Sequence, residues 1–309
     1  MLKRHWTLVS GGAICLFLAF FASPGDLSHL PPEMNDIHYG SFLKPVASGP
    51  ETSLLNWNIE RGTDYGKIQA AIRKHNPDLC ILQEVDLHAR RSGDKDVAAA
   101  LASEFGYDYA FGIEFQELSQ GTQEAPAYHG QAILSRQPLL NVRLLRFQNQ
   151  SSFWQPTGLL PTKLPLFQRR VGGRIALIGE EETAAGKLVI YDVHLESRNT
   201  ENLRLRQVEE ILADAARYSA DVTVLIAGDF NNKVPWSPVI PALRKAGFRS
   251  ALGEKSVRTH AIVGSLDWIF VRGPGQLESG AVHREDHGSD HYPVVARLRM
   301  SASTNRISP

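Results

Sequence analysis

Apolar runs that stop at polar residues recur along this chain. In the clearest of them, residues 223–227 are apolar and rich in β-branched side chains, which predicts a buried strand ending at Gly228. Side chains two positions apart on an extended segment point the same way, so Asp229 and Asn231 are expected to face one spot just beyond that strand. Because Gly, Asp and Asn are also common turn residues, this stretch alone favours a turn and a site equally.

The spacing of apolar positions predicts the other elements. Ile68, Ala71 and Ile72 repeat at helical spacing, and Pro77 follows the end of their helix. Helices are predicted over 65–75, 96–105, 203–216 and 237–246, with Arg204 and Arg206 on a solvated face. Strands are predicted over 53–57, 78–83, 107–111, 131–135, 174–179, 187–194, 223–227, 266–271 and 293–298. Strands and helices alternate first, and strands cluster afterwards.

Two segments lack a regular period. Residues 149–173 contain Pro156, Pro161 and Pro165 together with aromatic residues, and predict a long surface loop that is either functional or a packed connector. Residues 25–49 are rich in Pro, Gly, Ser and His, and predict a linker or an extended lead-in.

The N-terminus has the pattern of an export segment. Lys3 and Arg4 precede residues 6–22, which carry no charge. We therefore expect a signal peptide or an uncleaved signal anchor over 1–24, with membrane association through residues 6–22. Because positive charges stay on the cytoplasmic side, the bulk of the chain is expected to be membrane-anchored or exported, outside the cytoplasm.

Composition excludes little. A chain of 309 residues with 43% hydrophobic content can bury a substantial core in one large domain or two small ones. The formal net charge is zero, so the chain has no global electrostatic footprint for nucleic acid, although a local basic groove stays open. Cys15 and Cys80 imply neither a disulfide framework nor a zinc site, because no Cys or His partner lies at ligand spacing.

Several predicted strands end in residues that can bind a metal or a phosphate. Each end alone could be an ordinary turn, but turns do not readily explain the whole series. The stretches are 57–60 (Trp-Asn-Ile-Glu), 82–84 (Leu-Gln-Glu), 192–194 (Asp-Val-His), 228–231 (Gly-Asp-Phe-Asn), 266–268 (Leu-Asp-Trp) and 289–291 (Ser-Asp-His).

As a set, these motifs resemble the endonuclease/exonuclease/phosphatase superfamily, or deoxyribonuclease-I-like fold. The segment 130–136 (Gly-Gln-Ala-Ile-Leu-Ser-Arg) is also similar to the central strand of that family. The resemblance runs from about residue 54 to 297. It implies an α/β four-layer α-β-β-α sandwich of two packed mixed sheets with outer helices, over a domain of residues 50–300 that leaves 301–309 as a tail.

The resemblance implies a metal site that suits a hard divalent cation. Glu84 would be the principal Mg²⁺ ligand, with Mn²⁺ as an alternative metal. Asn58 and Asp290 would complete or support the site, and Glu60 lies where the family often has an acidic residue that assists the metal. Carboxylate and amide oxygens together with waters are the ligands that Mg²⁺ prefers.

The catalytic residues are implied in the same way. Asp229 would orient or deprotonate the attacking water, and Asn231 would donate hydrogen bonds to the developing phosphorane. His291 would contact the phosphate or act as a base, with Asp267 holding its ring. His194 lies where some members have a histidine that protonates the leaving group and others have a tyrosine.

Three further residues have less specific assignments. Arg174 is a candidate phosphate ligand, whereas His129 and His287 are expected to be loop histidines.

The sequence therefore predicts a Mg²⁺-dependent phosphoesterase that hydrolyses a phosphodiester, either a nucleic acid or a phospholipid head group, and acts as a monomer. The alternatives are a phosphomonoesterase of small metabolites and a catalytically idle binding module on the same fold. A Ser/His/Asp esterase is disfavoured because the chain has no Gly-x-Ser-x-Gly motif.

Overall fold

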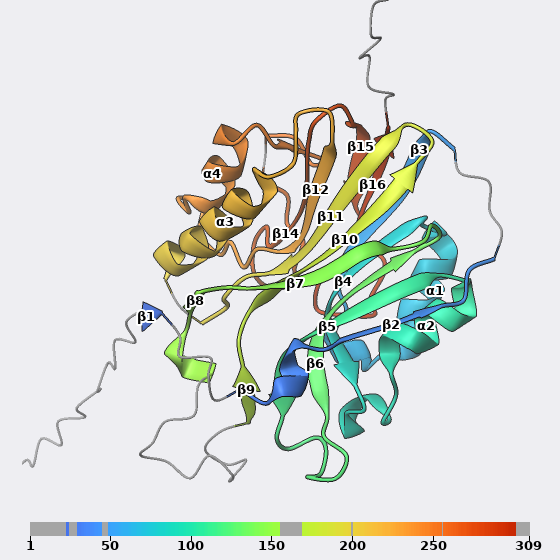
Figure 1. The fold of residues 1–309 in the computed structure, drawn as a ribbon, viewed down its shortest axis with the longest axis vertical. Coiled ribbons are helices and arrows are strands. Elements are labelled where there is room, and N and C mark those ends of the chain that lie inside the picture. Colours follow the sequence, from blue (N-terminus) through green and yellow to red (C-terminus); the bar gives the residue numbers. More distant parts are fainter. Residues whose placement is uncertain are drawn as a thin grey trace, which may run out of the picture.

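The computed structural model describes residues 23–24, 30–44, 49–154, 169–198, 200–254 and 256–300. Two mixed β-sheets pack face to face, with helices on the two outer sides (Figure 1). The predicted α/β four-layer sandwich is therefore confirmed.

The first sheet has eight strands in the order β15-β16-β3-β4-β6-β5-β2, with β9 pairing with β5. Strands β3 and β4 are parallel, so both end at the same edge. Helices α1 (Tyr65–His75) and α2 (Val97–Phe105) pack on its outer face. The strands are β2 (Ile37–Ser41), β3 (Glu51–Asn58), β4 (Leu79–Leu87), β5 (Asp108–Glu117), β6 (Tyr128–Ser135), β9 (Arg170–Gly172), β15 (Gln276–Val282) and β16 (Val294–Arg299).

The second sheet has six strands in the order β13-β14-β12-β11-β10-β7. Strands β11 and β12 are parallel, and β14 runs antiparallel to β12. Helices α3 (Glu201–Ala215) and α4 (Val239–Lys245) cover its outer face. The strands are β7 (Leu140–Arg146), β10 (Ile175–Thr183), β11 (Gly186–His194), β12 (Thr223–Asp229), β13 (Arg249–Ser250) and β14 (Asp267–Arg272).

Burial on both faces of each sheet explains the unbroken apolar runs of the central strands. Leu54 faces the layer between the sheets and Leu55 faces α1 and α2, as alternation along a strand requires. The inter-sheet layer also contains Ile81, Ile190 and Leu225.

The predicted helices are present with ordinary caps. Helix α1 spans the predicted residues, with Asp64 accepting from the Lys67 amide at its start and Asn76 in the left-handed conformation after its end. Helix α2 is capped by Asp96 and ends at Gly106, whose φ is 76°. Short 3₁₀ turns lie at Pro32–Asn35 (η1), Glu60–Gly62 (η2), Arg90–Ser92 (η3) and Ser152–Trp154 (η4).

Part of the segment 25–49, predicted to be a linker or an extended lead-in, is an extended strand of the first sheet. Within this segment β2 pairs antiparallel with β5 and forms the edge of the first sheet. Its residues are only partly buried, so the strand shows no apolar alternation in the sequence. Strands β7 and β15 were missed for the same reason.

Two side-chain predictions were wrong. His129 lies in β6 and is fully buried, so it is not a loop histidine, whereas His287 lies in a loop and is exposed as predicted. Arg204 is buried, because its guanidinium donates to the Glu196 carbonyl at 2.7 Å and pairs with Glu201.

The predicted loop over 149–173 is partly a packed connector. It contains β8 (Asn149–Gln150), η4 and β9, and β8 pairs with β1 (Ser23–Pro24). Trp154 is buried and donates its indole N–H to Glu196 at 3.0 Å.

Several predictions lie outside the described residues. They are the export segment over 6–22, the middle of the loop at 155–168 and the tail over 301–309. Among the described residues, no helix is long and apolar enough to cross a membrane. The localisation and membrane association stay predictions.

Candidate active site

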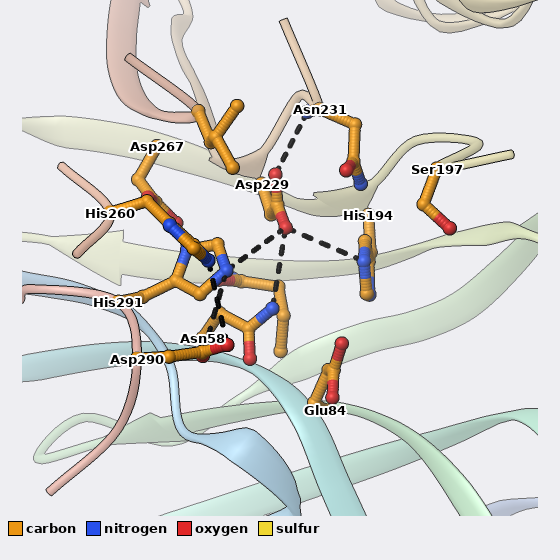
Figure 2. A network of polar contacts seen from close by, with 12 residues as sticks. Asn58, Glu84, His194, Ser197, Asp229, Asn231, His260, Asp267, Asp290 and His291 are labelled. Carbon is orange, nitrogen blue, oxygen red and sulfur yellow. Dashed lines mark hydrogen bonds and ion pairs between the residues drawn. The ribbon is translucent and has the colours of Figure 1, made fainter. Parts of the chain in front are cut away.

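Strand register brings the predicted residues together at one end of the sandwich. His194 pairs with Asp229 across β11 and β12, and Asp229 pairs with Asp267 across β12 and β14. Asn58 ends β3 beside Gln83 of β4 in the other sheet. Figure 2 shows the resulting network, in which side chains from both sheets point toward a shared space.

Asp229 is the centre of this network. Its Oδ2 lies 3.3 Å from Asn58 Nδ2, 3.5 Å from His194 Nε2 and 3.8 Å from His291 Nε2. Its Oδ1 accepts from the Asn231 backbone N–H at 2.8 Å, which orients the carboxylate. The side chain is buried, with 3% exposed. One carboxylate oxygen therefore faces both predicted catalytic histidines.

His291 and Asp267 form a buried dyad. His291 Nδ1 lies 2.9 Å from Asp267 Oδ2, and Trp57 Nε1 donates to the His291 carbonyl at 2.9 Å. Burial alone would lower the pKa of His291, but the charge of Asp267 and its hydrogen bond, followed by Asp229 and Asp290, raise it to about 10. The pair therefore holds the ring as an imidazolium whose Nε2 points toward Asp229 (Figure 2).

His194 is supported from behind by Glu114. His194 Nδ1 lies 3.5 Å from Glu114 Oε2, and the Arg174 guanidinium lies 3.2 Å from the same oxygen. Arg174 also donates to Ser197 Oγ at 3.2 Å. Arg174, predicted as a phosphate ligand, is thus 2% exposed and paired with Glu114.

Glu84 enters the site from a distorted part of β4. The register with β6 shifts between Leu82 and Val85, and Glu84 adopts a φ of 52°. A left-handed backbone at a residue other than glycine costs on the order of 1–2 kcal/mol, so the surrounding sheet must stabilise this conformation. The bulge turns the carboxylate toward the site (Figure 2).

The charge of Glu84 is stabilised by its neighbours. Arg61 lies 3.4 Å from Glu84 Oε2. Burial alone would raise the pKa of Glu84, but Arg61 and three histidines outweigh it and hold the pKa well below its usual range. Glu84 is therefore an ionised carboxylate.

The remaining predicted ligands lie on two neighbouring loops. Asn58 Oδ1 accepts from the Glu60 backbone N–H at 3.1 Å, and Glu60 Oε2 accepts from the Asp290 N–H at 3.2 Å. Asp290 Oδ2 lies 3.4 Å from His260 Nε2, and the His260 ring meets the His291 ring edge-on at 4.6 Å. All predicted site residues thus belong to this region of the molecule.

Sequence reasoning missed three residues of the site. Glu114 is a fully buried charge inside an aromatic strand, and a carboxylate within the run Phe111 to Phe115 was the available signal. His260 and Arg61 lie in a loop and a short turn without periodicity, so nothing local distinguished them.

The side chains can hold a metal. One ligand atom each from Asp229, Asp267 and His291 lie within 4.8 Å of one another, and the same is true of His260, Asp290 and His291. Glu84 and Asn58 add oxygen atoms from the opposite sheet. Such oxygen-rich surroundings suit a hard divalent cation.

The chain belongs to the Endonuclease/Exonuclease/phosphatase family, whose family model matches residues 55–291. It is therefore an enzyme of the phosphoric ester hydrolase class, and the predicted family is confirmed.

Solved structures share the fold at low sequence identity. An endonuclease/exonuclease/phosphatase from Beutenbergia cavernae is 19% identical, with a TM-score of 0.60 over 81% of this chain and 72% of that chain. The human Nocturnin catalytic domain with bound sulfate is 18% identical, with a TM-score of 0.60 over 87% and 99%. ANGEL2, a 2′,3′-cyclic phosphatase in complex with adenosine-2′,3′-vanadate, is 16% identical, with a TM-score of 0.56 over 86% and 98%. No curated protein sequence matches the chain.

Proposed function

We propose that this enzyme hydrolyses a phosphodiester with the help of a divalent metal, Mg²⁺ in the first instance. The observation that carries the proposal is the position of Asp229. Its Oδ2 lies within 3.8 Å of two histidines and an asparagine, and the ionised Glu84 points into the same space from the other sheet (Figure 2).

The donor set fits such a metal. Glu84 is ionised, the Asn58 amide oxygen keeps a lone pair beyond its bond with the Glu60 N–H, and Asp290 is exposed nearby. These residues, with Glu60 behind Asp290, would hold the ion. When bound, it neutralises charge on the phosphoryl oxygens and on the leaving oxygen.

Asp229 is placed to receive a proton from an attacking water. Its orientation is fixed by the Asn231 N–H, so its Oδ2 presents a lone pair to the shared space. The Asn231 side chain donates one amide hydrogen to the Leu195 carbonyl at 3.0 Å and keeps the other for a phosphoryl oxygen.

The two histidines supply protons and positive charge. Because its pKa is raised to about 10, His291 is protonated at neutral pH and acts as a hydrogen-bond donor to the phosphoryl group, not as the base. His194 is held between Glu114 and Asp229, which suits it to donate a proton to the leaving oxygen.

Local charge favours a diester over a monoester. Four carboxylates, those of Glu84, Asp229, Asp267 and Asp290, gather around the shared space (Figure 2), and Arg61 and His291 offset part of their negative charge. A monoanionic diester meets less repulsion here than a dianionic monoester does. The exposed Lys233, whose Nζ bonds to the Ser197 carbonyl at 2.8 Å, adds attraction at the rim.

The test is hydrolysis of a chromogenic phosphodiester by the full chain. We expect activity with Mg²⁺, none in EDTA, recovery on adding Mg²⁺, and loss of at least about 100-fold in Asp229→Asn. Asp221→Asn, an exposed aspartate before β12, is the matched control and should keep full activity. Full activity in EDTA, or an active Asp229→Asn protein, contradicts the proposal.

A substrate panel then separates the candidate diesters. It contains the diesters DNA, RNA, sphingomyelin and a 2′,3′-cyclic nucleotide, and an inositol monophosphate as the monoester for comparison. The cyclic nucleotide is included because the similar ANGEL2 is a 2′,3′-cyclic phosphatase. A preference for the monophosphate would overturn the diester assignment and leave the hydrolase class intact.

A further inference from the structure

A second group of metal-binding side chains lies outside the active-site network. His75 is the last residue of α1, and His283 and Asp286 lie just after β15. His283 and Asp286 belong to the connection from β15 to β16, and the same connection later carries Ser289, Asp290 and His291. None of the three takes part in the contacts around Asp229.

The three side chains converge closely. One ligand atom from each lies within 4.8 Å of the other two. His75 Nε2 is 2.7 Å from Asp286 Oδ2, and the rings of His75 and His283 have centroids 4.3 Å apart. The side chains of His75 and Asp286 are 8% and 11% exposed, and that of His283 is 27% exposed. The cluster is therefore largely shielded but open on one side.

Neighbouring charges leave one face of the carboxylate for a ligand. Lys74 Nζ lies 2.9 Å from Asp286 Oδ1 and 2.9 Å from Glu285 Oε1. Lys74 therefore binds the Oδ1 atom of Asp286, while the Oδ2 atom faces the imidazole rings. Glu285 Oε1 also lies 3.1 Å from His283 Nδ1, which places a further oxygen donor at the edge.

We propose that His75, His283 and Asp286 form a second metal site, selective for a transition metal such as Zn²⁺. Two imidazoles and one carboxylate match the ligands of Zn²⁺, whereas Mg²⁺ prefers oxygen and waters. Tetrahedral ligands about 2.0 Å from Zn²⁺ lie about 3.3 Å apart, so small side-chain rotations from the observed spacing suffice. The fourth position is open to water or Glu285.

Such an ion would join the end of α1 to the loop that carries His291. That loop already packs tightly against β3 and α1, because a Cβ added at Gly288 would meet Trp57 of β3 at 2.9 Å and the Ile68 nitrogen of α1 at 3.1 Å. The ion would add a second anchor to the same loop, five positions before Gly288 at His283. Its function is therefore structural support of the active site, separate from the oxygen-rich site at Glu84.

The test is Zn²⁺ titration of the full chain by calorimetry in excess Mg²⁺, with thermal unfolding in parallel. We expect His283→Gln and Asp286→Asn each to bind one equivalent of Zn²⁺ fewer than the wild type. Free Zn²⁺ at a hundredfold excess over its Kd should raise the wild-type Tm by about 5 °C more than that of either variant. His287→Gln, an exposed histidine of the same loop, is the matched control and should behave as the wild type.

The outcomes are decisive in both directions. Equal Zn²⁺ stoichiometry in wild type and both variants overturns the site, as does an equal loss in His287→Gln. Unfolding without added metal gives each variant's own Tm, so a folding defect is seen separately from lost binding. Because the readout is binding, failure of the diesterase assay leaves this result unaffected.

Discussion

Replacing Glu114 with glutamine should destabilise the protein by removing the carboxylate that forms an ion pair with the buried Arg174. Glu114 is fully buried, and its oxygens lie 3.2 and 3.3 Å from Arg174 and 3.5 Å from His194. Burial alone would raise the pKa of Glu114, but Arg174 and then His194 lower it from 4.5 to about 2. That shift corresponds to about 3 kcal/mol of stability at neutral pH.

The sign follows from the lowered pKa. The contribution is fully present above pH 4.5, the unfolded value, and is lost as the pH falls through about 2. In Glu114→Gln the Arg174 guanidinium would keep its hydrogen bond to Ser197 and lose its ion pair. Removing one partner of a buried ion pair costs about 3–5 kcal/mol. We therefore expect a loss of about 3 kcal/mol at pH 7 and about 1 kcal/mol at pH 3.

The assay is urea unfolding followed by tryptophan fluorescence at both pH values. The double variant Glu114→Gln/Arg174→Gln removes the stranded cation, so it should lose less than the two single variants added together. A loss below about 1 kcal/mol at pH 7, or strict additivity in the double variant, would show that the pair does not stabilise the fold.

Three other perturbations test different parts of the structure. Burial raises the pKa of Glu181 from 4.5 to about 7, so the stability that its neutral form contributes is lost as the pH rises through 7. Relative to the wild type, Glu181→Gln should therefore become more stable by about 3 kcal/mol between pH 4 and pH 9, as urea unfolding measures. Gly228→Ala should lower both Tm and kcat/KM, because the new Cβ would lie 1.8 Å from the Val193 carbonyl oxygen and force β11 and β12 apart; calorimetry and diester kinetics measure it. Asp267→Asn should lower kcat at pH 7 by about 100-fold or more, since His291 loses the carboxylate that holds it protonated; steady-state kinetics measures it.

Each has a control. Glu182 is exposed beside Glu181, so Glu182→Gln should show no pH-dependent gain in stability. An equal gain in stability there would show that burial is not the cause of the effect at Glu181. Gly186→Ala has open space for its Cβ, although its φ of 123° adds strain, so it should keep kcat/KM where Gly228→Ala does not. An Asp267→Asn protein with wild-type kcat would mean that His291 needs no carboxylate behind it.

Elements with a buried face were predictable from sequence, and edge strands were not. Helix α1 has its predicted bounds because Ile68, Ala71 and Ile72 are buried and Asp64 caps its start. Strand β2 escaped prediction because half-burial at the sheet edge leaves no period of 2 in its side chains. Its partner β5 lies about 70 residues away in the sequence, so no local signal could pair them.

The site shows the same division. The sequence motifs predicted Asp229, Asp267 and His291. Asp229 ends β12, whereas Asp267 begins β14 and His291 precedes β16. Because β12 and β14 are antiparallel, the end of one strand lies beside the start of the other. Glu114 and His260 act through partners far away in sequence, so their roles depend on packing that motifs do not encode. The bulge at Glu84 was likewise invisible, since it arises from the register between β4 and β6.

Because Glu84 and Asp229 lie on opposite sheets, the distance between their carboxylates depends on the spacing of the two sheets, and the rate of hydrolysis depends on that distance. The two carboxylates are spaced by a layer that includes Ile81, Ile190 and Leu225, all of which are fully buried. Trimming or enlarging those aliphatic groups would tilt one sheet against the other and change the gap that a phosphoryl group must fill. Substitutions in this apolar core would then change kcat without altering any polar residue of the site.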